Sequence, residues 1–176
     1  MKITLNILVL FVSIICFGQD KIDIKISLAG PTFETVQTID SLVMKNIYRL
    51  GRTAIIKAFK DSKDVIQLDD IEEGKLFARG ITSYQWVFLL TVRDINVWFD
   101  LDFQARDGKY RIFVDNLIME WYVDGHGLQT QTFQEFCDKR KGKNGKETCD
   151  GIRRNLTNVI ESLVYDIRSG SVNSDW

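Results

Sequence analysis

The sequence contains few of the residues on which metal centres and acid–base catalysis usually depend. Its 176 residues include one histidine, three cysteines and one proline. Cys16 lies in the N-terminal segment that we interpret below as an export signal, and the two other cysteines with one distant histidine fall short of the four ligands of a zinc site. The chain also has no nucleophile elbow, no zinc-protease helix motif and no phosphate-cradling glycine loop. We therefore predict no metal, no cofactor and no catalytic residue, and we interpret His126, which lies between two glycines, as a surface-turn residue.

An excess of positive charge is also missing. Lys and Arg together number 23 against 24 Asp and Glu, which gives a net charge of −1. A protein that binds phosphate backbones usually carries a basic surplus, so this balance excludes nucleic acid as the expected partner. The hydrophobic fraction of 45% and charged fraction of 27% are instead typical of one folded globular domain.

The N-terminal segment resembles an export signal. Lys2 provides a short positive region, Ile7–Phe17 follows as a run that is apolar except for Ser13, and no further charge occurs until Asp20. This apolar run has the length of a signal-peptide core and is too short for a membrane-spanning helix. We predict that residues 1–18 are a signal peptide and that the chain is periplasmic or extracellular, with no transmembrane segment after cleavage.

The cleavage site follows from the small residues at the end of this segment. Cys16 and Gly18 occupy the −3 and −1 positions if the chain is cut after Gly18, which leaves residues 19–176 as the mature chain. Lipidation of Cys16 is the alternative. We favour cleavage because Ile15 precedes this cysteine, whereas a small residue usually precedes a lipidated one.

Removal of the signal peptide leaves Cys137 and Cys149 as a pair. An even number of cysteines in an oxidising compartment favours a disulfide. This disulfide encloses a basic segment, residues 139–146, that contains no apolar side chain and that we interpret as a solvated loop.

The hydrophobic period predicts a strand and then a long helix in the first third of the mature chain. Residues 21–28 alternate strictly between polar and apolar side chains, which indicates a half-buried strand. From Glu34 to Lys60, apolar residues recur at three- and four-residue steps, which predicts one amphipathic helix.

The period then returns to two. We expect a strand over residues 65–70, a turn at residues 71–74, and a hairpin partner over residues 75–85. The limits of the apolar run 86–92 are not fixed by the sequence, and residues 93–96 have the composition of the next turn.

The Asp107-Gly108 pair is the clearest local signal. It lies between two alternating segments, where a two-residue type I′ turn is the favoured hairpin connection. This turn fixes the strand register. Arg106 is then opposite Lys109, Ala105 opposite Tyr110, Phe103 opposite Ile112, and Leu101 opposite Val114.

A loop over residues 123–148 and a final helix complete the chain. Within this loop, residues 132–135 match a capping box that begins a short helix leading to Cys137. Apolar residues from Ile152 to Ile167 form the stripe of the last helix, and Gly170 has the position of its C-cap. Together these elements predict an α+β fold with the order β-α-β-β-β-β-α, in which two helices cover one face of a curved antiparallel sheet.

The segment from Val65 to Glu120 resembles a bacterial secreted family of unknown function described as having a TBP-like fold. The resemblance rests on residues 106–111 (RDGKYR), on the acidic turn 72–74, and on Arg79-Gly80. It extends over a core of about residues 21–169 and implies an exported, single-domain TBP-like α+β fold with no assigned activity. DNA binding does not follow from it, because fold alone does not carry function.

The outer face of the Asp107-Gly108 hairpin is the candidate binding surface. Its binding candidates are Trp98 and Phe113, as hydrophobic anchors, and Arg111. The register places these side chains on that face: Trp98, Asp100, Asp102, Gln104 and Arg106 from one strand, and Lys109, Arg111, Phe113 and Asp115 from the other. It also sets Asp100 opposite Asp115, a like-charge pair that Arg111 partly compensates from its position diagonal to Asp102.

Two kinds of function remain open. The preferred hypothesis is a non-enzymatic binding or structural module of the cell envelope, whose partner is an envelope protein or a glycan. The alternative is an enzyme with an unrecognised polar site formed by Asp100, Asp102, Arg111 and Asp115. A concave pocket around these side chains would favour the enzyme, and a flat, solvated arrangement would favour the binding module.

Overall fold

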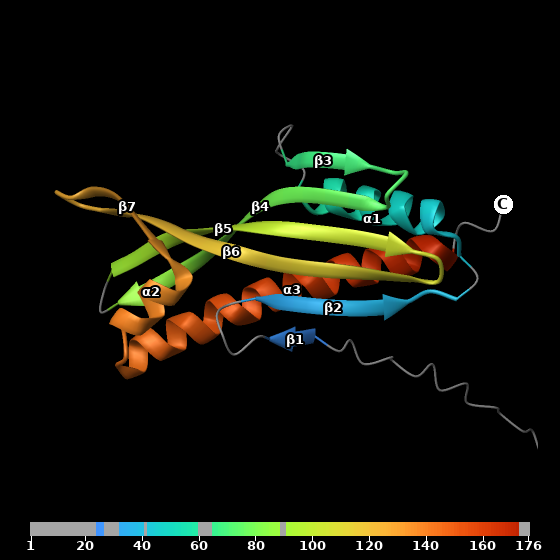
Figure 1. Cartoon of the computed structure of the whole chain (residues 1–176). Helices are drawn as coiled ribbons and strands as arrows, with labels where there is room; N and C mark the ends of the chain where they lie inside the picture. Colours follow the sequence, from blue (N-terminus) through green and yellow to red (C-terminus); the bar gives the residue numbers. More distant parts are fainter. Residues whose placement is uncertain (1–23, 27–31, 41, 60–64, 89–90, 173–176) are drawn as a thin grey trace, which may run out of the picture.

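The computed structural model describes residues 24–26, 32–40, 42–59, 65–88 and 91–172 (Figure 1). The predicted signal peptide, residues 1–18, lies outside this part of the chain, as does its alternative lipidation site, Cys16. Most of the predicted strand 21–28 lies outside it too, and the described portion of that segment is the short strand β1, Ile24–Ile26.

The described residues form one antiparallel sheet and three helices. The elements in chain order are β1, β2 (Phe33–Thr38), α1 (Met44–Ala58), β3 (Ile66–Asp70), β4 (Lys75–Phe88), β5 (Thr91–Arg106), β6 (Lys109–Val123), β7 (Gly127–Thr132), α2 (Phe133–Lys139) and α3 (Lys143–Val172). Neighbouring strands follow the order β1-β2-β6-β5-β4-β3, and β7 pairs with the second half of β6. The predicted α+β class is confirmed.

Both long helices lie on the same face of the sheet, as expected from the sequence. Figure 1 shows both helices behind the sheet, with α1 behind β4 and α3 crossing behind β6 and β2. The two helices also pack against each other. The opposite face of the sheet, which we call the outer face, has no helix over it in Figure 1.

The core lies between the helices and the inner face of the β5–β6 hairpin. The predicted register is confirmed at all four rungs, from Arg106 opposite Lys109 to Leu101 opposite Val114. The side chains of Leu101, Phe103 and Ile112 are almost completely inaccessible to solvent. A one-residue slip would bury charged side chains in their place, which explains why this register is unique.

One glycine allows α1 to approach the sheet closely. A Cβ atom at Gly51 would lie 2.2 Å from Cζ of Phe103. Any larger side chain here would collide with a ring in the centre of the core. Gly51 is therefore required by helix–sheet packing, although glycine weakens a helix interior.

The single helix predicted from Glu34 to Lys60 is wrong in its first part. Residues 33–38 form β2, in which Phe33, Thr35 and Gln37 are buried against the core, while Val36 is 54% exposed. The helix α1 begins only at Met44, whose backbone N–H donates to Oδ1 of Asp107 at 2.7 Å. The cap of α1 thus comes from a distant hairpin turn, and no local sequence feature marks this boundary.

The turn predicted at residues 93–96 is also wrong. These residues lie inside β5, where Ile95 is fully buried opposite Tyr84 of β4. The connection between β4 and β5 falls within the apolar run 86–92, between Phe88 and Thr91. Because apolar residues lie on both sides of this connection, the hydrophobic pattern did not indicate its position.

The segment 123–148 is more ordered than the predicted loop. It contains β7, α2 and the beginning of α3. The capping box is confirmed, since the Thr132 side chain accepts from the Glu135 N–H and the Glu135 side chain accepts from the Thr132 N–H. Gly170 does not cap the last helix, because α3 continues to Val172.

Candidate functional site

The outer face bears the side chains predicted for it. Trp98 and Phe113 are both half-buried there, and β7 lies beside β6 as a further strand. Trp98 Nε1 donates to Oε2 of Glu120 at 2.7 Å, so its indole is held against β6. The Arg111 guanidinium carbon lies 4.8 Å from the centre of the Phe113 ring, within the range of a cation–π contact.

Arg111 pairs with a residue that the sequence did not suggest. Its Nε donates to Oε1 of Glu34 on β2 at 2.8 Å. Asp102, the expected diagonal partner, instead accepts from Nε2 of Gln104 at 2.9 Å. Glu34 was assigned to a helix from the sequence, and its position on the strand next to β6 explains the missed ion pair.

The predicted like-charge pair is present. Asp100 on β5 is opposite Asp115 on β6. Oδ2 of Asp100 accepts a hydrogen bond from Nδ2 of Asn116 at 2.8 Å, and Oδ1 of Asp100 lies 3.4 Å from Nε of Arg79. Burial, with the nearby charges of Asp100 and Asp102, raises the pKa of the Asp115 carboxyl. Asp100 is therefore compensated by its neighbours, while Asp115 carries the electrostatic cost of the pair.

A β-bulge lies directly beside this pair. The β5–β6 register shifts between Trp98 and Asp100, so that β6 has one extra residue there. Asn116 has a φ of 49°, the left-handed conformation that asparagine tolerates better than most residues. This bulge was not predicted, and the asparagine after an alternating run was the only local signal for it.

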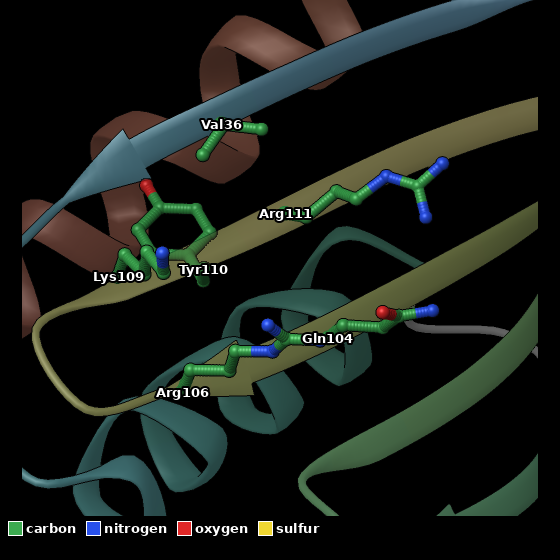
Figure 2. Close-up of a pocket in the computed structure, with 6 residues that line it drawn as sticks. All are labelled: Val36, Gln104, Arg106, Lys109, Tyr110 and Arg111. Atoms are coloured by element: carbon green, nitrogen blue, oxygen red, sulfur yellow. The ribbon is translucent and has the colours of Figure 1, made fainter.

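Two depressions mark the outer face, one on each side of Gln104. The first has a volume of about 270 Å³ and is shown in Figure 2. It is lined by Val36, Gln104, Arg106, Lys109, Tyr110 and Arg111. The second has a volume of about 440 Å³. It is lined by Gln67, Leu68, Lys75, Leu76, Phe77, Asp102 and Gln104.

The first depression, which we call the cationic hollow, draws its lining from three neighbouring strands. Figure 2 shows Val36 on β2, three residues on β6 and two on β5, with the Arg106 side chain extending along β5 toward Gln104. Burial raises the pKa of the Tyr110 hydroxyl to about 12, so this group stays neutral. The hollow is therefore positively charged. The sequence placed its β5 and β6 side chains correctly but missed Val36.

The polar residues of the enzyme alternative are not gathered in one of these depressions. Asp102 lines the second depression and Arg111 lines the cationic hollow. Asp100 and Asp115 line neither. Among the residues that the structure describes, no group of three or more His, Cys, Asp or Glu side chains could hold a metal ion.

Cys137 and Cys149 form the predicted disulfide, with their Cα atoms 6.0 Å apart. It joins α2 to α3, and Cys149 is buried in the core. The basic segment that it encloses is not a free loop, because α3 begins at Lys143.

Arg140, between these two helices, packs against aromatic rings of the core. Its guanidinium carbon lies 3.8 Å from the ring centre of Phe136 and 5.4 Å from that of Trp121. Burial lowers the pKa of this guanidinium. Arg140 is thus part of the packing of the domain. No helix in the described part of the chain is both long and apolar enough to span a bilayer.

Comparisons with known proteins place this arrangement in a defined group. Residues 33–119 match a family model described as "Domain of unknown function (DUF4468) with TBP-like fold". No curated protein sequence matches the chain significantly.

Two solved structures are similar to the fold. A DUF4468 family protein from Bacteroides ovatus superposes with a TM-score of 0.66 at 11% identity, covering 82% of this chain and 90% of its own. A TBP-like protein from Parabacteroides distasonis has the same TM-score at 9% identity, covering 82% of this chain and 96% of its own. At these identities the likeness concerns the fold.

Proposed function

Since the chain belongs, through residues 33–119, to the family described as a domain of unknown function (DUF4468) with TBP-like fold, we propose its function from the outer face of its sheet. We infer that it is a non-enzymatic binding module of the cell envelope, and that this face contacts an envelope protein or a glycan. The observation that carries the proposal is the asymmetry of the sheet. Helices cover one face in Figure 1, while the other face presents two half-buried aromatic side chains and two depressions.

The aromatic side chains suit a binding surface. Trp98 and Phe113 are held in place by Glu120 and Arg111, so little side-chain entropy is lost when a partner packs on them. Two aliphatic side chains add exposed apolar area on the same face: Leu68 is 50% exposed, and Ile81 is 40% exposed. Rigid aromatic anchors within a polar surround are the usual composition of a binding hot spot.

The charged groups of this face support binding more than catalysis. Arg111 is engaged by Glu34, and Asp100 by Arg79 and Asn116. Side chains that form ion pairs and hydrogen bonds with one another in this way make a pre-arranged binding surface. Catalysis by a general acid or base requires instead a group that can exchange a proton with the substrate.

An exported location fits the disulfide. Intracellular thiol reductants keep most cytosolic cysteine pairs reduced, whereas the Cys137–Cys149 bond is typical of an oxidising compartment. Together with the sequence of residues 1–18, this supports cleavage after Gly18 and a periplasmic or extracellular mature chain.

Site-specific photo-crosslinking in the producing cells tests the proposal. A benzophenone amino acid replaces Phe113 on the outer face in one variant and Tyr165, which is 71% exposed on α3, in a matched control. We expect an adduct of higher mass at position 113 and none at position 165. Absence of an adduct at position 113, or equal adducts at both positions, would overturn the binding role of this face.

The enzyme alternative has one supporting observation, the raised pKa of Asp115 between neighbouring carboxylates. Raised carboxyl pKa values concentrate at active sites, although structural charge clusters produce them too. A turnover found for the full chain and lost in Asp115→Asn would favour the enzyme over the binding module.

A further inference from the structure

The cationic hollow lies at the turn end of the outer face. None of its lining residues, all in the described part of the chain, is acidic. Three of them carry a positive charge, namely Arg106, Lys109 and Arg111. The hollow thus concentrates positive charge on a chain whose net charge is −1.

Two of these three cations have no acidic partner among the residues that the structure describes. Arg111 is paired with Glu34 at 2.8 Å. Across the described residues, no ion pair forms with Arg106 or Lys109, and these two side chains are opposite each other on the last rung of the β5–β6 ladder. Like charges that face each other across a ladder destabilise the sheet, so a bound anion would relieve this repulsion.

We propose that the cationic hollow binds the phosphate monoester group of a ligand. This inference rests on the proposed binding role of the outer face and names the chemistry of the ligand at one end of it. After the Arg111–Glu34 pair, two positive charges are left uncompensated. A phosphate monoester carries a charge of about −1.5 to −2 near neutral pH and balances both, whereas a carboxylate balances one.

Shape and donor type agree with this ligand. The hollow, at about 270 Å³, is smaller than most sites for whole small molecules, which occupy roughly 300–1,000 Å³. It therefore takes the phosphoryl group, while the rest of the ligand lies along the outer face. A guanidinium fork binds two phosphate oxygens at once, and an ammonium adds a compact charge, so Arg106 and Lys109 supply complementary donors.

Titration of the full chain with inorganic phosphate, monitored by nuclear magnetic resonance, tests the proposal. We expect shift changes centred on residues 106–111. Arg106→Gln and Lys109→Gln should each weaken phosphate binding by roughly tenfold, because each removes one charge-assisted contact. Arg154→Gln and Lys141→Gln, which remove exposed cations outside the hollow, should leave the affinity for phosphate unchanged. Acetate should bind more weakly than phosphate.

Further ligands distinguish the possible sources of the phosphate. Glucose 6-phosphate represents a soluble phosphosugar. Phosphatidylcholine vesicles with and without phosphatidic acid represent a lipid headgroup. Stronger binding of one of these probes than of inorganic phosphate identifies the source.

Three results would overturn the proposal: no shift at residues 106–111 with phosphate, acetate binding as tightly as phosphate, or an equal loss of binding in Arg154→Gln. Unfolding temperatures of all variants show whether the fold is intact. An adduct at position 113 without phosphate binding would reject the phosphate site and leave the binding role of the face standing. Phosphate binding without an adduct would reject the broader role.

Discussion

Asp100 and Asp115 are directly opposite each other on neighbouring strands, and within the described part of the chain only Asp100 has compensating partners. On the same two strands, Arg106 and Lys109 form a second like-charge rung of the opposite sign. The outer face of the β5–β6 hairpin is therefore electrically polarised along its length. Like-charge rungs cost stability in an isolated sheet, and their presence on the uncovered face agrees with a surface that contacts a charged partner.

Asp115→Asn should stabilise the protein at neutral pH. The pKa of Asp115 is raised above its ordinary value of 3.8, so the folded state holds this proton more tightly than the unfolded state does. Ionised Asp115 thus costs stability near neutral pH, and this cost disappears as the pH falls below the ordinary value. Urea unfolding should show a gain of about 0.5 kcal/mol at about pH 7 and none at about pH 3.

Asp100→Asn is the matched control for that variant. It removes a charge from the same rung but weakens the contact with Arg79. We expect no gain in the free energy of unfolding. Equal gains for the two variants would contradict the unequal compensation of the pair.

Gly51→Ala should destabilise the fold although alanine favours helices. The added Cβ would lie 2.2 Å from Cζ of Phe103, whose ring is completely buried. Overpacking of this kind costs about 1–3 kcal/mol in the free energy of unfolding. Thr53→Ala, on the exposed side of the same helix, should change it by less than about 0.5 kcal/mol. Phe103→Leu should rescue Gly51→Ala in a double-mutant cycle, and strict additivity would contradict the predicted contact.

Asp107→Ala should destabilise α1 through its N-terminus. The carboxylate of Asp107 accepts the Met44 N–H at 2.7 Å and replaces a local cap. Loss of an N-cap acceptor costs about 1 kcal/mol. Asp107→Asn keeps both an acceptor oxygen and a residue suited to the turn, so it should cost much less. Equal losses in the two variants, measured by urea unfolding, would contradict the cap, because asparagine retains an acceptor oxygen and alanine does not.

Replacement of both Cys137 and Cys149 by serine should lower the free energy of unfolding by roughly 3 kcal/mol, because the ring closed by the disulfide restricts the unfolded chain. A reductant should shift the unfolding of the natural chain by a similar amount and leave the serine variant unchanged. An unchanged unfolding midpoint in both experiments would show that the bond contributes nothing to stability.

The structure also shows which features local sequence can determine. The β5–β6 register was predictable because a two-residue Asp-Gly turn and strict alternation both act over short distances. The same locality made the capping box at Thr132 and the disulfide predictable. These features place Trp98, Phe113 and most of the cationic hollow.

The features that were missed depend on contacts between distant residues. The boundary between β2 and α1 is set by pairing with β6 and by the cap from Asp107, neither of which lies near it in the sequence. Consequently Val36 and Glu34 were placed on a helix, and the ion pair of Arg111 was not foreseen. β7 has no buried side chain in its burial pattern, so its pairing with β6 left no hydrophobic signal.

Side-chain footprinting in intact cells is the most direct test of the central claim that the outer face binds a partner. Hydroxyl-radical oxidation of Trp98 and Phe113 is compared between cells and the purified protein, with Tyr165 of α3, which is 71% exposed, as the internal reference. The proposal predicts that both outer-face aromatics are protected in cells relative to Tyr165. Equal oxidation ratios in cells and in the purified protein would contradict it.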